Sequence, residues 1–298
     1  MSGRPPDETA ASGLPGLRWG WILAGPLGLS LLLLVGSQAV FLQHSFYVDL
    51  AFGKTSPQAS LANYARIVSD PYYLRTLWLT TWISLAVAAV CVVAGFPVAR
   101  TLSRLQSRWT TWILSAIVVT SFISTVVQIF GLVILFRADG PINQVLMGLG
   151  WMVRPFSIVG TPTGVVLGLV YASFGFGVML LYGVMRAIPA SLDEAAALHG
   201  ASRLRVLSRV VLPLSLPGLI VAFLTIFNTS MGAFTSAALL GGGRIITVPV
   251  LIQRTMLLDV KYGMAAALAA LLLIFVIALN GLSLWVLRRS RHGRGLAL

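Results

Sequence analysis

Long apolar segments separated by short polar ones dominate this sequence. Six of these segments contain no Asp, Glu, Lys or Arg, and each is long enough to cross about 30 Å of hydrocarbon at about 1.5 Å per residue. They lie at 21–42, 77–98, 110–136, 163–184, 218–240 and 263–287. Helices on the surface of a soluble protein are usually shorter and carry a polar face. The pattern therefore predicts an all-α polytopic membrane protein with six transmembrane helices.

The composition agrees with this prediction. Apolar residues make up 57% of the chain and charged residues 10%, whereas soluble domains contain about 25% charged residues. The first apolar segment is longer than the apolar part of a cleaved signal sequence, which has about 7–15 residues, so we expect it to remain as a span. The single cysteine, Cys91, lies inside the second segment, where a buried thiol behaves as a small apolar side chain.

The net charge of +13 is distributed unevenly over the loops. Six spans place the N-terminal tail, loops 99–109 and 185–217 and the C-terminal tail on one side of the membrane. Most arginines are on that side: Arg4, Arg18, Arg100, Arg104, Arg108, Arg186, Arg203, Arg205, Arg209, Arg288, Arg289, Arg291 and Arg294. The positive-inside rule then predicts that both termini are cytoplasmic. We expect this cationic face to meet anionic lipid headgroups and not nucleic acid, because no basic helix carries interleaved aromatic residues for base stacking.

The residues present disfavour an enzymatic or metal-binding function. Gly53-Lys54-Thr55 resembles the end of a Walker A motif, but Val48 occupies the position of its first glycine and no strand–loop–helix pattern surrounds it. The three histidines lie in different loops, so we predict no metal site. No paired carboxylates and no serine–histidine–carboxylate arrangement suggest an integral-membrane enzyme.

An ion-coupled secondary transporter is a further alternative. Proton-coupled carriers usually need a titratable group within the membrane. The acidic residues of this chain all lie outside the apolar segments: Asp7, Glu8, Asp49, Asp70, Asp139, Asp193, Glu194 and Asp259. This placement argues against proton coupling, whereas sodium coupling through backbone carbonyls stays open.

The polar loop between the fourth and fifth segments predicts two short helices joined by a turn. Ser191 and Glu194 have the spacing of a capping box, in which each side chain bonds the backbone amide of the other residue at the start of a helix. Gly200 is placed to end this helix in the left-handed conformation. A second short helix is expected to follow and to be ended by Pro213 and Pro217.

The spacing of this loop resembles the signature of permease subunits of binding-protein-dependent ABC importers. The pattern starts at Glu194 and reads Glu-Ala-Ala, three residues, Gly, nine residues, an aliphatic residue, one more residue and Leu-Pro. Val210 stands where the family usually has isoleucine. The resemblance implies a type I ABC importer permease architecture, in which the loop at 189–213 docks into a separate ATP-hydrolysing subunit. It assigns to this coupling loop the residues Ser191, Glu194, Ala195, Ala196, Gly200, Leu212 and Pro213.

The resemblance also implies the partners, the location and the domain organisation. The partners are expected to be an ABC ATP-binding subunit, a second homologous permease subunit and an extracytoplasmic solute-binding protein. The location is expected to be the bilayer of a bacterial plasma (inner) membrane. The chain itself is expected to bind no cofactor, because ATP is bound by the partner subunit. We divide the chain into a tail, first helix and outer loop at 1–70, a permease domain of five helices at 71–287 and a basic cytoplasmic tail at 288–298.

Polar residues inside the spans are candidates either for the substrate path or for hydrogen bonds between helices. For Gln128 and Asn280, hydrogen bonding between helices is the favoured interpretation. Gln128 is nevertheless kept as a candidate for the path. The cluster at 228–232 fits both interpretations, because consecutive polar residues beside a glycine can loosen a helix where substrate passes. The candidates for the path are Gln128, Asn228, Thr229, Ser230 and Gly232.

The substrate class follows only from the resemblance. The chain looks most like the spermidine/putrescine permease group, which implies a polyamine. Aromatic side chains such as Tyr171, Phe174 and Phe176 could bind a polycation by cation–π contact. Related permeases carry ferric iron, phosphonates or sulfate-like anions, so these substrates stay open as alternatives.

Overall fold

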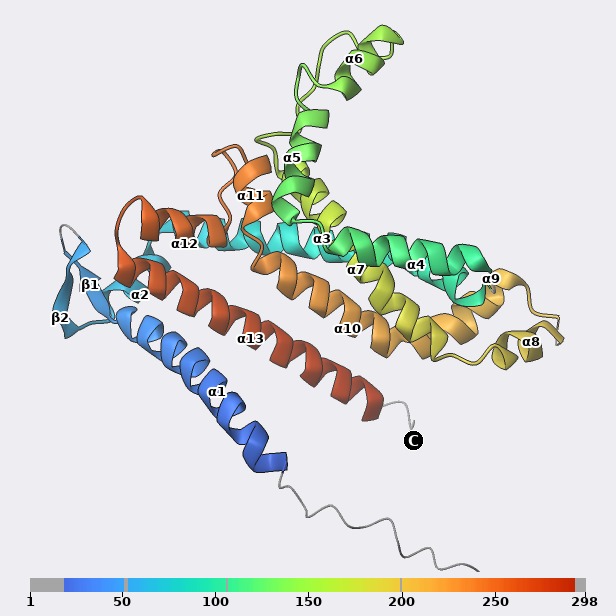
Figure 1. Cartoon of the computed structure of the whole chain (residues 1–298), viewed down its shortest axis with the longest axis horizontal. Helices are drawn as coiled ribbons and strands as arrows, with labels where there is room; N and C mark the ends of the chain where they lie inside the picture. Colours follow the sequence, from blue (N-terminus) through green and yellow to red (C-terminus); the bar gives the residue numbers. More distant parts are fainter. Residues whose placement is uncertain (1–18, 51–52, 106, 199, 293–298) are drawn as a thin grey trace, which may run out of the picture.

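The computed structural model describes residues 19–50, 53–105, 107–198 and 200–292. The predicted tail at 1–18, His199 and the chain after 292 lie outside these residues. Long helices run side by side between two ends of the molecule (Figure 1). A small β-hairpin lies at one end, the hairpin end. The helices of the 189–213 loop lie at the other, the knob end.

Five of the described helices are long and apolar enough to cross a membrane. They coincide with the first, second, fourth, fifth and sixth predicted segments, and these spans are confirmed. The helix that covers most of the fifth predicted segment runs from Arg203 to Met231, the last residue of α10. The elements are α1 (Trp19–His44), α3 (Pro71–Arg104), α7 (Pro162–Arg186), α10 (Leu212–Met231) and α13 (Tyr262–His292).

α3 lies at the centre of the bundle, where α7 and α10 pack along it. Its Cys91 is fully buried in an apolar cluster with Val165 of α7 and Ile226 of α10. The helices approach closely where one of them contributes a glycine: a Cβ atom on Gly218 of α10 would lie 2.5 Å from the side chain of Val184 of α7. Apolar packing around small residues therefore holds the core, as is usual between membrane helices.

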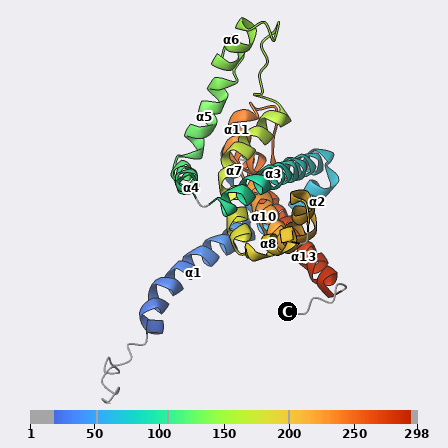
Figure 2. The same ribbon diagram turned by 90° about the vertical axis from the view of Figure 1, so that its right-hand side faces the viewer.

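The third predicted segment is broken in the structure. α4 (Arg108–Ser121) and α5 (Thr125–Leu135) meet at an angle of 98°, so the segment 110–136 is not one straight helix. Together the bent pair is still long and apolar enough to form the sixth span. α5 turns away from the bundle, and α6 (Pro141–Gly148) extends this projection further (Figures 1 and 2). Figure 2 also shows α1 leaving the bundle in a different direction from this α5–α6 arm.

Side-chain hydrogen bonds surround the break. The Gln128 amide donates to the carbonyl oxygens of Thr120 at 2.9 Å and Ile123 at 3.2 Å. The hydroxyls of Thr120 and Ser121 donate to carbonyls one turn earlier, and such contacts often bend helices. A carbonyl at a helix break needs a partner where water is absent. Gln128 bonds the Ile123 carbonyl and adds a second bond to the Thr120 carbonyl, which also accepts from the Ile123 amide at 3.1 Å.

The fifth predicted segment ends early. α10 ends with Gly232 as its cap, and a separate short helix, α11 (Thr235–Leu240), follows. The prediction of a continuous span across 218–240 is therefore wrong in its last turns, because glycine interrupts a helix at low cost. α11 packs back against α5 and α7, and the carbonyl of Leu240 accepts a hydrogen bond from the Gly160 amide at 2.7 Å.

The hairpin, which the sequence did not predict, joins the first and last spans. β1 (Tyr47–Asp49) pairs in antiparallel fashion with β2 (Thr55–Ala59). The carboxylate of Asp49 accepts hydrogen bonds from the amides of Gly263 at 2.7 Å and Met264 at 2.8 Å. These are the first amides of α13, which have no partner within that helix. A carboxylate at this position also complements the positive end of the helix dipole.

Two shorter helices complete the hairpin end. They are α2 (Ala62–Ser69) and α12 (Val248–Leu257). Asn63 of α2 donates to two backbone carbonyls of the segment that enters β1, at 3.1 and 2.9 Å. The amide of Val248 donates to the hydroxyl of Thr80 of α3 at 2.9 Å. Polar side chains therefore fix these helices to the ends of the spans.

Candidate functional site

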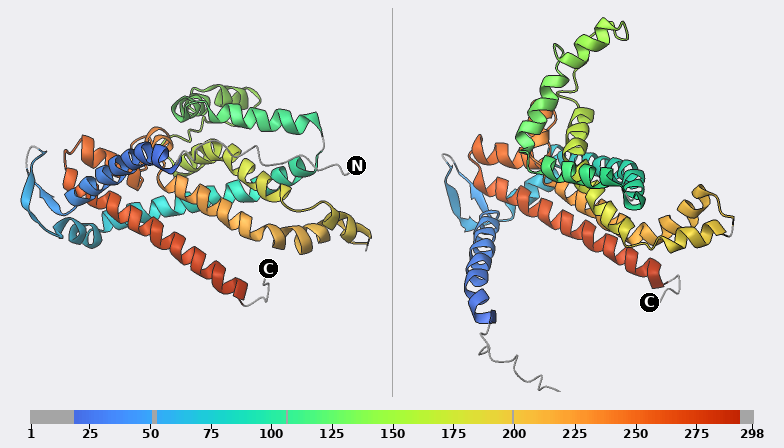
Figure 3. Two further views of the ribbon diagram at one scale, coloured as in Figure 1. Left: turned by 60° about the horizontal axis from the view of Figure 1, so that its bottom comes forward. Right: turned by 45° about the vertical axis from the view of Figure 1, so that its right-hand side comes forward.

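The knob (residues 189–213) has the predicted order of helix, glycine turn and helix. Its helices are α8 (Ser191–Leu198) and α9 (Arg203–Val206), and Figure 3 shows that it extends beyond the main bundle. Gly200 has a φ of +72°, the left-handed conformation that strains other residues. The Ala201 amide donates to the Ala196 carbonyl at 3.1 Å and closes the turn. The conformation of Gly200 is thus the predicted one.

The start of α8 differs from the prediction. The Ala190 carbonyl accepts hydrogen bonds from the amides of Asp193 at 2.9 Å and Glu194 at 3.2 Å. Ser191 is therefore already inside the helix, so the predicted capping box between Ser191 and Glu194 is wrong. Both of these side chains are exposed, and the Glu194 carboxylate is available to a group outside the chain.

α8 has two chemically different faces. Glu194 and Ala195 are exposed, whereas Ala196 packs against an apolar cluster beneath the knob. Leu198 of α8 and Leu204 of α9 are 89% and 78% exposed. Large apolar side chains exposed outside the membrane mark interaction surfaces. Sequence reasoning missed these two leucines, although an apolar side chain in a polar loop was a visible signal.

Asp193 lies on the side of the knob that faces α3, in a cluster with two arginines of that helix. Its Oδ2 atom is 2.7 Å from Arg100 Nη2 and 3.0 Å from Arg104 Nε. Arg104 also donates from Nη2 to the carbonyl of Ile188 at 3.1 Å. This cluster was not predicted from the sequence, because Arg100 and Asp193 are 93 residues apart and both arginines were assigned to lipid headgroups.

Leu212 and Pro213 join the knob to the fifth span. Leu212 is the first residue of α10 and Pro213 lies in its first turn. The expectation that Pro213 and Pro217 end the second helix is wrong, because the helix continues from α9 through a π-helical turn (Leu207–Val211) into α10. A proline is tolerated there because its missing N–H falls where the wider π turn already interrupts the regular bonding pattern.

Three of the path candidates lie together near the end of α10, and one of them bonds to another span. The amides of Asn228 and Asn280 of α13 exchange two hydrogen bonds of 3.0 Å each. Thr229 donates to carbonyls of its own helix, and the Ser230 hydroxyl is buried without a hydrogen-bond partner among the described residues. Gly232 caps the same helix, whereas Gln128 lies on α5 and bonds to the break after α4. Asn228 thus serves hydrogen bonding between helices.

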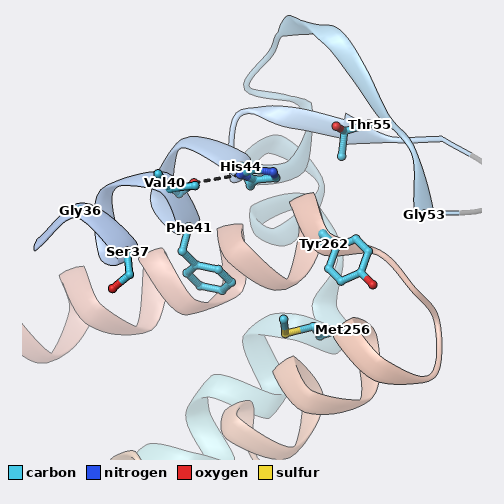
Figure 4. A pocket seen from close by; sticks show the side chains of 9 residues that line it. All are labelled: Gly36, Ser37, Val40, Phe41, His44, Gly53, Thr55, Met256 and Tyr262. Atoms are coloured by element: carbon cyan, nitrogen blue, oxygen red, sulfur yellow. Dashed lines mark hydrogen bonds between the residues drawn. The ribbon is translucent and has the colours of Figure 1, made fainter. Parts of the chain in front are cut away.

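A cavity of about 490 Å³ lies at the hairpin end, between α1 and α13 (Figure 4). Phe41 and Tyr262 project into it from these two helices, and the His44 ring bonds to the Val40 carbonyl at its edge. No path candidate lines this cavity, so it is separate from the predicted path. Its lining residues are Gly36, Ser37, Val40, Phe41, His44, Gly53, Thr55, Met256 and Tyr262.

Comparisons with known proteins agree with this geometry. The family model described as "Binding-protein-dependent transport system inner membrane component" matches residues 91–292. The spermidine/putrescine transport system permease protein PotB of Escherichia coli (strain K12) is 30% identical over 260 residues, which cover 87% of this chain and 90% of that protein. PotB of Haemophilus influenzae is 27% identical over 210 residues, which cover 70% of this chain and 73% of that protein.

Two solved structures share the fold. A chain of a bacterial alginate ABC transporter, in complex with an alginate pentasaccharide-bound periplasmic protein, superposes with a TM-score of 0.76 at 16% identity and covers 95% of this chain and 98% of its own length. A chain of the MetNI methionine ABC transporter in an inward facing conformation has a TM-score of 0.56 at 18% identity and covers 72% and 94%.

The amide pair between α10 and α13 generates a first prediction. In a double-mutant cycle of Asn228→Leu and Asn280→Leu, we expect a coupling free energy of about 0.6–1.7 kcal/mol, from the average to the maximum measured for hydrogen bonds between membrane helices. The measurement is the free energy of unfolding in lipid bicelles. Thr229→Val is the control, because its hydroxyl bonds only within α10 and should not couple to Asn280. A coupling energy of zero for the asparagine pair would contradict the prediction.

Proposed function

This chain belongs to the family of binding-protein-dependent transport system inner membrane components and is a permease subunit of an ABC importer, and we propose that its substrate is a polyamine such as spermidine or putrescine. The similarity to PotB over 87% of the chain is the observation that supports this substrate. Ferric iron, a phosphonate or another small ion is the alternative.

Aromatic residues of α7 provide a way to bind a polycation without carboxylates. Tyr171 and Phe176 are 51% and 44% exposed, and the described spans contain no Asp or Glu within their apolar parts. The face of an aromatic ring attracts an ammonium group, so a polyamine can pass such a surface without being held tightly by a fixed negative charge.

The substrate proposal predicts a competition profile. In proteoliposomes that contain the complete transporter and its loaded binding protein, we expect unlabelled putrescine to compete with labelled spermidine uptake, and ferric iron or phosphonate not to compete. Tyr171→Ala and Phe176→Ala should each raise the KM about 2–30-fold, which corresponds to a cation–π contact of about 0.5–2 kcal/mol. Trp78→Ala on α3, whose side chain is 70% exposed, is the control. Uptake of iron or phosphonate in place of polyamine would refute the proposal.

The partners follow from the exposed face of the knob and from the family. We propose that the knob docks through Glu194, Ala195 and Leu198 on an ABC ATP-binding subunit, which binds the ATP, so that this chain needs no cofactor. A second homologous permease subunit completes the path, because one chain supplies half of a pseudo-symmetric pore. An extracytoplasmic solute-binding protein delivers the substrate at the hairpin end.

The proposed orientation places the knob end in the cytoplasm. The start of α1 and the end of α13 both lie toward the knob end (Figure 1), and the arginine asymmetry predicts a cytoplasmic location for this side. The chain is a multi-pass inner-membrane protein, and in this orientation both of its termini are cytoplasmic.

Cysteine labelling tests this orientation. On a Cys91→Ser background, a membrane-impermeant maleimide should label Ser60→Cys at the hairpin end in intact spheroplasts. It should label Ser202→Cys in the knob only after permeabilisation. The opposite pattern, with Ser60→Cys labelled only from the cytoplasmic side, would reverse the proposed orientation.

The coupling loop yields a prediction for transport. Gly200→Val forces a β-branched residue into a left-handed conformation at a cost of about 1–2 kcal/mol, and Glu194→Lys reverses the charge of the exposed face. We expect either change to abolish uptake and to reduce co-purification of the ATP-binding subunit or its substrate-stimulated hydrolysis, while membrane insertion is unchanged. Gly200→Asn should retain uptake, because asparagine tolerates this conformation. Normal uptake in both damaging variants would mean that the loop is only a connector.

A further inference from the structure

Asp193 occupies the face of α8 that is turned toward the bundle. Its carboxylate contacts Arg100 at 2.7 Å and Arg104 at 3.0 Å. The two arginines are one helical turn apart on α3 and therefore share a face of that helix. The exposed fractions of the three side chains are only 18%, 26% and 23% for Arg100, Arg104 and Asp193, so their charges are largely shielded from water and interact more strongly than exposed charges do.

Arg104 also contacts the segment that leads into the knob. Its Nη2 atom donates to the carbonyl oxygen of Ile188 at 3.1 Å, and Ile188 lies between the end of α7 and the start of α8. One arginine of α3 therefore holds both the entry to the knob and the first helix of the knob. This geometry fixes the position of α8 relative to α3 in two places.

α3 has no direct backbone connection to the knob, in contrast to α7 and α10. The chain enters the knob from α7 and leaves it into α10, so a displacement of the knob reaches both helices through covalent bonds. Asp193 carries the ion pairs between α3 and the knob among the described residues. Because α7 and α10 both pack along α3, a knob that moved without α3 would shear the core of the bundle.

The cluster also contains buried polar atoms that make no hydrogen bond within the described residues. Asp193 Oδ1 and Arg100 Nη1 are buried and have no hydrogen-bond partner among the described residues. A contact that only fixes a fold usually satisfies its buried polar atoms. Unused atoms on both partners allow the carboxylate and the guanidinium groups to exchange bonds when α8 shifts, so that the link to α3 persists during movement.

We propose that Asp193 is a positioning residue that, through Arg100 and Arg104, transmits the displacement of the knob to α3. The inference rests on the proposed function, because it requires an ATP-hydrolysing partner that moves the knob. Its role differs from that of Glu194 and Leu198: those side chains contact the partner, whereas Asp193 joins the knob to the helix at the centre of the bundle.

The test measures transport and hydrolysis in the same proteoliposomes, which contain the complete transporter and its loaded solute-binding protein. ATP-dependent uptake by the unchanged transporter is established first, and this step tests the proposed function by itself. Asp193→Asn keeps the size of the side chain and removes its charge. We expect this variant to retain the ATP-binding subunit within about twofold and to retain at least about half of the substrate-stimulated hydrolysis, while the amount of solute transported per ATP falls at least about tenfold.

Rescue variants separate transmission from a general structural role. Exchanging the charges in the double variant Asp193→Arg/Arg100→Asp should restore the transport-to-hydrolysis ratio to within about threefold, whereas each single change should not. Asp193→Glu should rescue in part, because it keeps the charge on a longer side chain. Asp139→Asn is the control, because its ion pair with Arg137 is exposed on the α5–α6 arm, away from the knob, and its removal should leave the ratio unchanged.

Two results would overturn the inference. A normal transport-to-hydrolysis ratio in Asp193→Asn would show that α3 moves without the carboxylate. Loss of the ATP-binding subunit from Asp193→Asn, with no recovery in the charge-exchanged variant, would show that Asp193 only supports docking or folding of the knob. If Asp193→Asn fails to accumulate, Arg100→Gln and Arg104→Gln give the same measurement, and a normal ratio in both would refute the proposal.

Discussion

Backbone amides and carbonyls within the hydrocarbon of a membrane have no water to bond, so each needs a partner inside the protein. Long helices meet this requirement along most of the chain. Where a helix stops, side chains supply partners: Gln128 bonds two carbonyls at the break between α4 and α5, and Asp49 bonds the first amides of α13. Isolated polar residues of this apolar sequence are therefore informative, because several of them mark the ends of regular hydrogen bonding.

The same requirement explains how the knob is built into the fifth span. A helix that ended at Pro213 would leave carbonyls exposed near the membrane surface. Instead, the π-helical turn (Leu207–Val211) and α10 continue one hydrogen-bonded helix from α9 through the proline. A continuous helix is stiff, so a force applied at α9 is transmitted along α10 to the region of Asn228. The second helix of the knob, α9, and the polar cluster near the end of α10 are thus parts of one continuous helix.

The features that depend on local sequence were predictable, and those that depend on distant residues were not. Uncharged length determines the spans, and a glycine at the end of a helix determines the turn at Gly200. The break before α5 depends on a side chain that reaches back five and eight residues, which a hydropathy pattern does not contain. The contacts of Asp193 with Arg100 and of Asn228 with Asn280 join residues 93 and 52 positions apart, and only packing brings them together.

The contact between Asp49 and the start of α13 has a consequence for biosynthesis. The carboxylate and the Gly263 amide are 214 residues apart. At a synthesis rate of about 5–20 residues per second, roughly 10–40 s pass between the synthesis of Asp49 and that of Gly263. During that time the carboxylate lacks the amides of α13, and α1 lacks the helix that packs along it. The bundle therefore closes only when its final helix is inserted, and a ribosome that stalls before residue 263 leaves every earlier span without this closure.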